Sequence, residues 1–139
     1  MSVLLEVADL AVVFHTKHGP VHAVDGLGFS VGRGEVLGIV GESGSGKSVT
    51  LRAVTRLLHG ATVTGRVTWQ GEDVLAMDDE RLRRMRGGQI GMVFQEPMAA
   101  LNPVLSIGLQ ITEALVAHTD LDAAGRQARA LELLDRPRS

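Results

Sequence analysis

Eight consecutive residues have the types and spacing of a phosphate-binding loop. Their sequence is Gly41-Glu42-Ser43-Gly44-Ser45-Gly46-Lys47-Ser48, which matches the pattern G-x-x-x-x-G-K-[ST] without a mismatch. Glycines in such a loop allow backbone N–H groups to approach phosphate oxygens, and the start of the following helix adds partial positive charge. We therefore predict that this loop binds the phosphates of a nucleotide. Lys47 would reach the β- and γ-phosphates, and the Ser48 hydroxyl would complete the shell of a magnesium ion.

Two elements must flank this loop in order to position it. Before the loop, residues Val36 to Val40 form a short, continuous apolar run, which is typical of a strand buried on both faces. After the loop, Leu51, Val54 and Leu58 recur at helical spacing, and Gly60 follows as a stop signal. The sequence thus predicts a strand, the loop and an amphipathic helix in that order.

The remainder of the chain predicts further strands first and helices afterwards. Two strands are expected at 4–14 and 21–31, joined by a polar turn in an antiparallel meander, and a third at 65–69. A second strand of the buried type is expected at Ile90–Phe94. Acidic residues at 78–80 precede a short basic helix, and the chain is expected to be helical from Pro103. Thr119 and Asp122 have the spacing of a capping box before the last helix.

The amino-acid composition excludes several classes of function for this chain. The chain has 139 residues, of which 45% are hydrophobic and 22% charged, as in a globular domain. It carries a net charge of −2, which argues against a nucleic-acid binder dominated by phosphate contacts. The arginines between Arg81 and Arg86 lie beside acidic residues, so we interpret them as a solvated helix face. Without cysteine there is no disulfide, thiol catalysis or cysteine-bound zinc, and no apolar run is long enough to span a membrane.

The motifs together resemble the ATP-binding cassette (ABC) ATPases. Besides the phosphate loop, the resemblance rests on residues 21–26 (VHAVDG), Gly34-Glu35, and residues 93–103 (VFQEPMAALNP). The QEPMxxLNP stretch is similar to that of the subunits that power oligopeptide, dipeptide and nickel importers. The resemblance extends to about Leu134. It implies an α/β P-loop NTPase of ABC type, incomplete, with the front of the nucleotide-binding core at 1–98 and the start of a helical subdomain at 99–139.

The resemblance also assigns roles to individual residues. Gln95 matches the Q-loop glutamine, which in that family touches Mg²⁺ and the attacking water; its spacing alone would make it an ordinary polar residue that closes a strand. Phe14 matches the aromatic residue that stacks on adenine, although a phenyl ring at a strand end can equally pack in the core. Val49 stands where many cassettes carry a hydroxyl residue, so only its backbone N–H could serve the α-phosphate.

Several motifs that the family uses for ATP hydrolysis do not occur in this sequence. These are the Walker B aspartate with its following glutamate, the switch histidine and the LSGGQ signature. We therefore expect a truncated cassette that binds nucleotide at most and has no ATPase activity alone. We also expect the apolar faces of Val36–Val40 to be exposed without neighbouring strands.

The resemblance implies a set of cofactors and partners. These are ATP and Mg²⁺, transmembrane permease subunits and a second ATP-binding subunit, at the cytoplasmic face of the cell membrane and without nucleic acid or direct membrane insertion. Two alternatives remain open: an ABC-type or other P-loop ATPase outside transport, such as one of DNA repair, and a non-catalytic nucleotide-binding fragment. The acidic balance and the QEPMAALNP run argue against the first of these.

Overall fold

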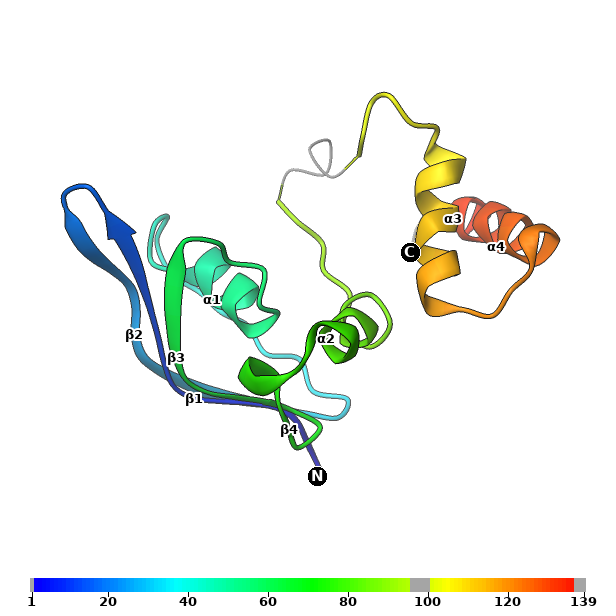
Figure 1. Ribbon diagram of the computed structural model, residues 1–139. Coiled ribbons are helices and arrows are strands. Elements are labelled where there is room, and N and C mark those ends of the chain that lie inside the picture. The colour runs from blue at the N-terminus through cyan, green and yellow to red at the C-terminus, as the bar shows by residue number, and fades with distance from the viewer. Residues whose placement is uncertain (1, 96–100, 137–139) are drawn as a thin grey trace. The chain divides into compact units, whose positions relative to one another are not determined.

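The structure, a computed structural model, describes residues 2–95 and 101–136 (Figure 1). The chain divides into two compact units, residues 1–79 and 80–139. The expected boundary after residue 98, between a nucleotide-binding core and a helical subdomain, stays a prediction.

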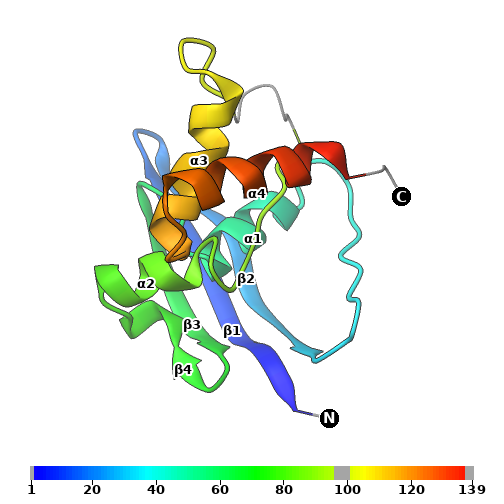
Figure 2. The ribbon, with the colours of Figure 1, turned by 90° about the vertical axis from the view of Figure 1, so that its right-hand side faces the viewer.

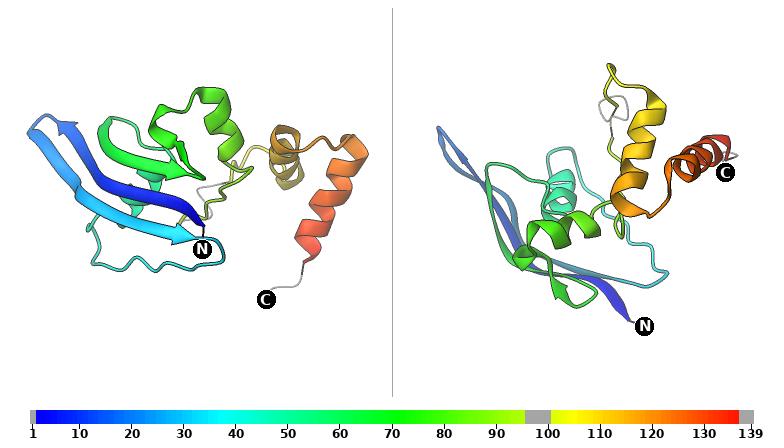
Figure 3. Two further views of the ribbon diagram at one scale, coloured as in Figure 1. Left: turned by 90° about the horizontal axis from the view of Figure 1, so that it is seen from below. Right: turned by 45° about the vertical axis from the view of Figure 1, so that its right-hand side comes forward.

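The first unit is built on an antiparallel four-stranded sheet in the order β2-β1-β3-β4. Its strands are β1 (Val3–Thr16), β2 (Gly19–Gly32), β3 (Ala61–Trp69) and β4 (Glu72–Asp73). The predicted meander is confirmed, and the tip of the β1–β2 hairpin, past the pair of Phe14 and Ala61, extends beyond the rest of the sheet (Figure 3). Leu10, Val12 and Val67 are fully buried and form the centre of the core.

A bulge in β1 explains why a glycine faces it in β3. Asp9 adopts a left-handed conformation with φ of 52°, and the pairing of β1 with β3 shifts register between Ala8 and Ala11. A Cβ atom on Gly65 would lie 2.4 Å from the Asp9 carbonyl oxygen. Only glycine allows the two backbones to approach this closely.

Two expected strands do not form, and both predictions are therefore wrong. Residues 36–40 lie in an irregular segment, with Val36 and Val40 exposed by 94% and 93%. Residues 91–94 likewise belong to no strand, and Val93 is 98% exposed. A strand requires neighbouring strands for its backbone N–H and C=O groups, and the sheet of the described residues, in the order β2-β1-β3-β4, includes neither segment. The exposure of apolar residues at 36–40 agrees with the expectation from sequence.

Helix α1 (Lys47–Val54) follows the phosphate loop and lies on one face of the sheet (Figures 1 and 3). It ends six residues before Gly60, so the predicted stop is wrong. Leu51 is exposed, whereas Thr50, Ala53 and Val54 are buried, so the apolar face lies differently from the predicted one. The periodicity indicated the helix correctly but not its length or its buried face.

A Schellman motif ends α1 with an arginine where glycine is the usual residue. The amide of Leu57 donates to the Arg52 carbonyl at 2.8 Å, closing the outer ring. The amide of Arg56 donates to the Ala53 carbonyl at 3.1 Å, closing the inner ring. Arg56 itself has φ of 54°, in the left-handed region. The helix is therefore stopped by hydrogen bonding within its own last turn.

The second unit contains two longer helices, α3 (Ile107–His118) and α4 (Ala123–Asp135), which pack side by side (Figure 2). Helix α2 (Asp79–Met85) begins at the division between the units, after a 3₁₀ turn, η1 (Val74–Ala76). The predicted short basic helix is confirmed, and so is the helical end, although its first helix begins at Ile107 rather than at Pro103. No helix in the described part of the chain is long and apolar enough to cross a bilayer.

Asp122 alone caps α4, so the predicted capping box is wrong. Its carboxylate accepts from the Gly125 amide at 2.7 Å, whereas the Thr119 hydroxyl donates back to the Leu115 carbonyl at the end of α3. A threonine can satisfy its hydroxyl on a carbonyl of the preceding turn, which removes it from the next helix.

Candidate functional site

Gly46 marks the point where the phosphate loop becomes helix α1. It is the N-cap residue, with φ of 95° in the left-handed region. A Cβ atom at this position would lie 2.7 Å from the Ala23 carbonyl oxygen and 3.4 Å from a methyl carbon of Val24, both in β2. The loop therefore rests directly on the backbone of β2, and only a residue without a side chain fits there.

The earlier part of the loop is a tight turn closed on itself. The Ser45 amide donates to the Glu42 carbonyl at 3.1 Å. A Cβ atom on Gly41 would lie 2.5 Å from the Ser45 hydroxyl oxygen, and Gly44 has φ of 82°. The left-handed conformation thus favours glycine at position 44, whereas a side chain at position 41 would have to displace the Ser45 hydroxyl group.

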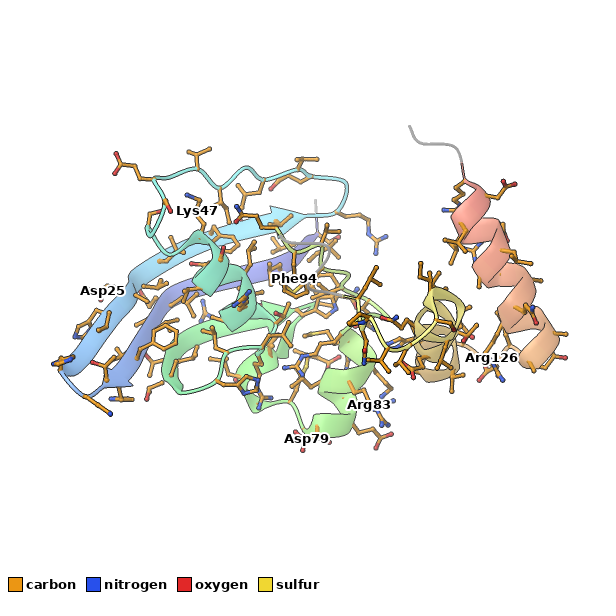
Figure 4. All side chains as sticks on the ribbon, turned by 90° about the horizontal axis from the view of Figure 1, so that it is seen from above. Asp25, Lys47, Asp79, Arg83, Phe94 and Arg126 are labelled. Atoms are coloured by element: carbon orange, nitrogen blue, oxygen red, sulfur yellow. The ribbon has the colours of Figure 1, made fainter. Side chains whose placement is uncertain are left out.

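The Lys47 side chain turns back across this loop. Its ammonium group donates to the carbonyl of Gly41 and, at 2.9 Å, to the carbonyl of Glu42. Figure 4 shows Lys47 at the start of α1, beside the loop. The structure thus gathers the ammonium group and the loop backbone in one place, which is the combination of charge and donors that suits a phosphate.

The first turn of α1 has no side-chain cap among the residues described. A helix start leaves its first amide N–H groups without partners inside the helix, and these groups carry a partial positive charge. Ser48 is exposed on this turn and Val49 is half-buried. The arrangement therefore presents backbone donors and a serine hydroxyl beside the Lys47 ammonium group.

Phe14 lies on the same face of the sheet as the loop. It is two residues beyond Val12, so both side chains project from one face of β1. Val12 pairs with Val24, which lies against Gly46. Phe14 is half-buried between its neighbours in β2 and β3, so its assignment to adenine stays a prediction.

Gln95 belongs to the second unit and is the last residue of the described range 2–95, and its side chain is exposed. The phosphate loop belongs to the first unit, so the predicted partnership of Gln95 with Ser48 around Mg²⁺ stays a prediction. The motif residues 96–100 lie outside the described residues.

Sequence reasoning missed two residues that hold α1 in place. Thr50 donates its hydroxyl hydrogen to the Gly46 carbonyl at 2.7 Å, from a buried position. Arg56 donates to the Met77 carbonyl at 2.7 Å and ties the end of the helix to the turn after η1. A threonine four residues after a glycine is a usable signal for the first bond. Nothing local in the sequence indicates the second.

Comparison with known proteins is consistent with this geometry. Residues 24–138 match the family model described as ABC transporter. The oligopeptide transport ATP-binding protein OppD of Bacillus subtilis is 44% identical over 135 residues, covering 95% of this chain and 38% of that protein. A putative peptide import ATP-binding protein of Brucella abortus is 48% identical, covering 97% of this chain and 41% of its own length. The OppD protein of Mycobacterium tuberculosis is 50% identical, with coverages of 97% and 22%.

A solved structure shares the fold. The ATP-binding cassette MJ0796, described as a dimer in a post-hydrolysis state bound to ADP and Pi, superposes with a TM-score of 0.82 at 26% identity. The match covers 94% of this chain and 56% of that one. This chain therefore spans about two fifths or less of the curated relatives named above and somewhat more than half of the solved cassette. Since the family model covers most of its residues, the chain belongs to the ABC transporter family.

Proposed function

We propose that this chain forms the nucleotide-binding part of the ATP-binding subunit of an ABC transporter. The transporter would import peptides or a related small solute. One observation carries the proposal: the loop at 41–48 places glycines, a lysine ammonium group and an uncapped helix start together against β2. This is the arrangement that binds nucleotide phosphates in P-loop proteins.

The residues present fit ATP and Mg²⁺. Gly46 packs against β2 without a side chain, and the helix start that follows it has no side-chain cap among the described residues. The loop residues would hold the phosphates, with Lys47 neutralising charge and Ser48 supplying a hydroxyl to the metal. The full proposed set comprises Gly41, Glu42, Ser43, Gly44, Ser45, Gly46, Lys47, Ser48 and the Val49 amide, with Phe14 on adenine and Gln95 as a second metal contact. Held by the Ser48 hydroxyl and the Gln95 side chain, the metal would neutralise negative charge on the phosphates.

The transport role rests on the relatives. Two of them are named as oligopeptide transport proteins, and another as a putative peptide import protein. By this proposal the chain works at the cytoplasmic face of the membrane, with transmembrane permease subunits and a second ATP-binding subunit as partners. Genes for two multispanning permeases and a solute-binding protein beside this one are the expected genomic context. Their absence, together with a neighbouring DNA-repair gene, would favour the alternative of an ATPase outside transport.

Binding of ATP by the purified chain tests the nucleotide part of the proposal directly. The chain contains two lysines, Lys17 in the turn between β1 and β2 and Lys47 in the loop. We expect Lys47→Ala to reduce ATP affinity by at least about 100-fold, because it removes the charge that meets the phosphates. Lys17→Ala removes the same charge elsewhere and should leave the affinity unchanged.

Isothermal titration calorimetry with ATP, with and without Mg²⁺, provides the measurement. Equal affinity in the two variants would contradict phosphate binding at this loop. If inorganic triphosphate binds as tightly as ATP, phosphate binding at the loop is supported, but the stacking of adenine on Phe14 is contradicted.

A further inference from the structure

Thr50 is a buried residue whose hydroxyl group has a defined partner in the phosphate loop. Its exposed fraction is 3%, and it lies in the first turn of α1. The hydroxyl donates to the Gly46 carbonyl oxygen at 2.7 Å, and the Thr50 amide donates to the same oxygen at 2.9 Å. One carbonyl of the loop thus accepts two hydrogen bonds from one residue.

These two bonds fix the orientation of the peptide group between Gly46 and Lys47. In a trans peptide the C=O and the following N–H point in opposite directions within one rigid plane. When the Gly46 carbonyl is drawn along the helix toward Thr50, the Lys47 N–H must point away from the helix, out of its start. Backbone N–H groups that bind an anion at a helix N-terminus point in this direction.

The β2 backbone restricts the same peptide from the other side. A Cβ atom on Gly46 would lie 2.7 Å from the Ala23 carbonyl oxygen, so Gly46 packs closely against the sheet. Gly46 has φ of 95°, and glycine is the most flexible residue once such contacts are lost. The loop therefore depends on contacts around Gly46 to keep one conformation.

We propose that Thr50 is a positioning residue for the nucleotide phosphates, acting through the Gly46–Lys47 peptide group. The inference rests on the proposed binding of nucleotide at this loop. It gives a role to the residue pair Val49-Thr50: the first has no hydroxyl group for the α-phosphate, and the second directs its hydroxyl to the buried side of the loop.

The same helix provides a matched control. Thr55 is 4% exposed and donates its hydroxyl hydrogen to the Leu51 carbonyl at 3.1 Å and the Arg52 carbonyl at 3.3 Å. It has the same chemistry as Thr50, at the opposite end of α1. Replacing either threonine by valine preserves the shape of the side chain and removes the hydroxyl donor.

The experiment compares Thr50→Val, Thr50→Ser and Thr55→Val in the 139-residue chain, with MgATP as the probe. We expect Thr50→Val to weaken MgATP binding by roughly 3- to 10-fold, the loss that corresponds to one hydrogen bond. Thr50→Ser should restore affinity to within about 2-fold, since serine keeps the donor. Thr55→Val should bind as the unchanged chain does.

Two further measurements separate positioning from folding and from the proposed function. The midpoint of thermal unfolding reports stability, and a Thr50→Val chain that binds weakly without melting earlier supports positioning. The ¹H–¹⁵N signal of Lys47 and its hydrogen exchange report the orientation of the peptide group without any nucleotide. If the unchanged chain does not bind MgATP, the proposed function fails. The positioning role is then judged on the Lys47 signal, which should move in Thr50→Val and stay in place in Thr55→Val.

Affinity in Thr50→Val equal to that of the unchanged chain would overturn the proposal. So would equal weakening in Thr50→Val and Thr55→Val, or a Lys47 signal that does not respond to Thr50→Val. A loss of affinity that tracks a lower unfolding midpoint in all three variants would also overturn it, because the hydroxyl group would then act only on stability.

Discussion

Helix α1 begins differently from α3 and α4. Helices α3 and α4 start with side-chain caps, in which Ser106 accepts from the Leu109 amide at 3.1 Å and Asp122 accepts from the Gly125 amide at 2.7 Å. Helix α1 starts at Gly46, with no side-chain cap among the described residues. A capped start satisfies amide donors with its own side chain, whereas an uncapped start leaves them open to water or to a ligand. The difference marks the start of α1 as the proposed phosphate site.

The two ends of α1 make a second comparison, because both contain a left-handed residue. At the start, glycine is required at position 46 because a Cβ atom there would lie too close to the Ala23 carbonyl oxygen. At the end, Arg56 adopts a similar conformation and uses its side chain, which donates to the carbonyls of Met77 and Val74. One end is fixed by the closeness of two backbones and the other by the reach of a guanidinium group.

The largest effect should come from adding a side chain at Gly46. We expect Gly46→Ala to lower the free energy of unfolding of the first unit by about 2–4 kcal/mol, since it combines a left-handed alanine with a contact on the Ala23 carbonyl. Urea denaturation followed by circular dichroism measures the change. Gly38→Ala is the control, because a Cβ atom at Gly38 has open space and the residue has no left-handed φ. Similar stability in the two variants would show that Gly46 is not held against β2.

Replacement of Arg56 should have a smaller effect that depends on the new residue. Arg56→Ala removes the bonds to Met77 and Val74 but keeps a side chain in the left-handed region, and we expect a loss of about 1–3 kcal/mol. Arg56→Gly removes the same bonds and relieves the backbone, so it should be more stable than the alanine variant by about 1 kcal/mol. Denaturation curves of the two variants give the difference. If the glycine variant is no more stable, the left-handed conformation of Arg56 carries no strain.

The phosphate loop could be predicted from sequence because its conformation is determined by residues close together in the chain. The tight turn at Gly41, the left-handed Gly46 and the helix start all follow from spacing within eight residues. The antiparallel meander was predictable for a similar reason, since the strands at 3–16 and 19–32 are joined by a short turn and pair with each other.

The errors concern features that depend on distant residues. Val36–Val40 has the composition of a buried strand, yet a strand forms only where neighbours supply hydrogen bonds, and the described residues supply none. The end of α1 combines a hydrogen-bonded last turn with the Arg56 side chain, whose guanidinium partners lie 18 and 21 residues further along the chain. Composition and periodicity describe what a segment is able to form, and these contacts determine what it does form.

The smallest effects should come from the capped helix starts, and they should be unequal. Asp122→Ala should cost about 1 kcal/mol, the usual value of a cap, whereas Ser106→Ala should cost about half of that. The reason is a second set of hydrogen bonds before α3. The Gln110 side-chain amide donates to the Asn102 carbonyl at 3.0 Å and accepts from the Asn102 backbone amide at 2.8 Å. These two bonds hold the turn before the helix even when the Ser106 hydroxyl is absent.

Hydrogen exchange at the Leu109 and Gly125 amides measures the two caps separately, and a double variant tests the explanation for their inequality. Because the Ser106 hydroxyl and the Gln110 amide group both hold one turn, Ser106→Ala combined with Gln110→Ala should cost more than the two single changes added together. Asp122→Ala combined with Gln110→Ala should be additive, since Asp122 caps α4 whereas Gln110 belongs to α3 and bonds to the turn before it. Strict additivity in the first pair would show that the Gln110 bonds to Asn102 do not support the start of α3. Both capped starts would then depend on one side chain each, and only the start of α1 would differ in kind.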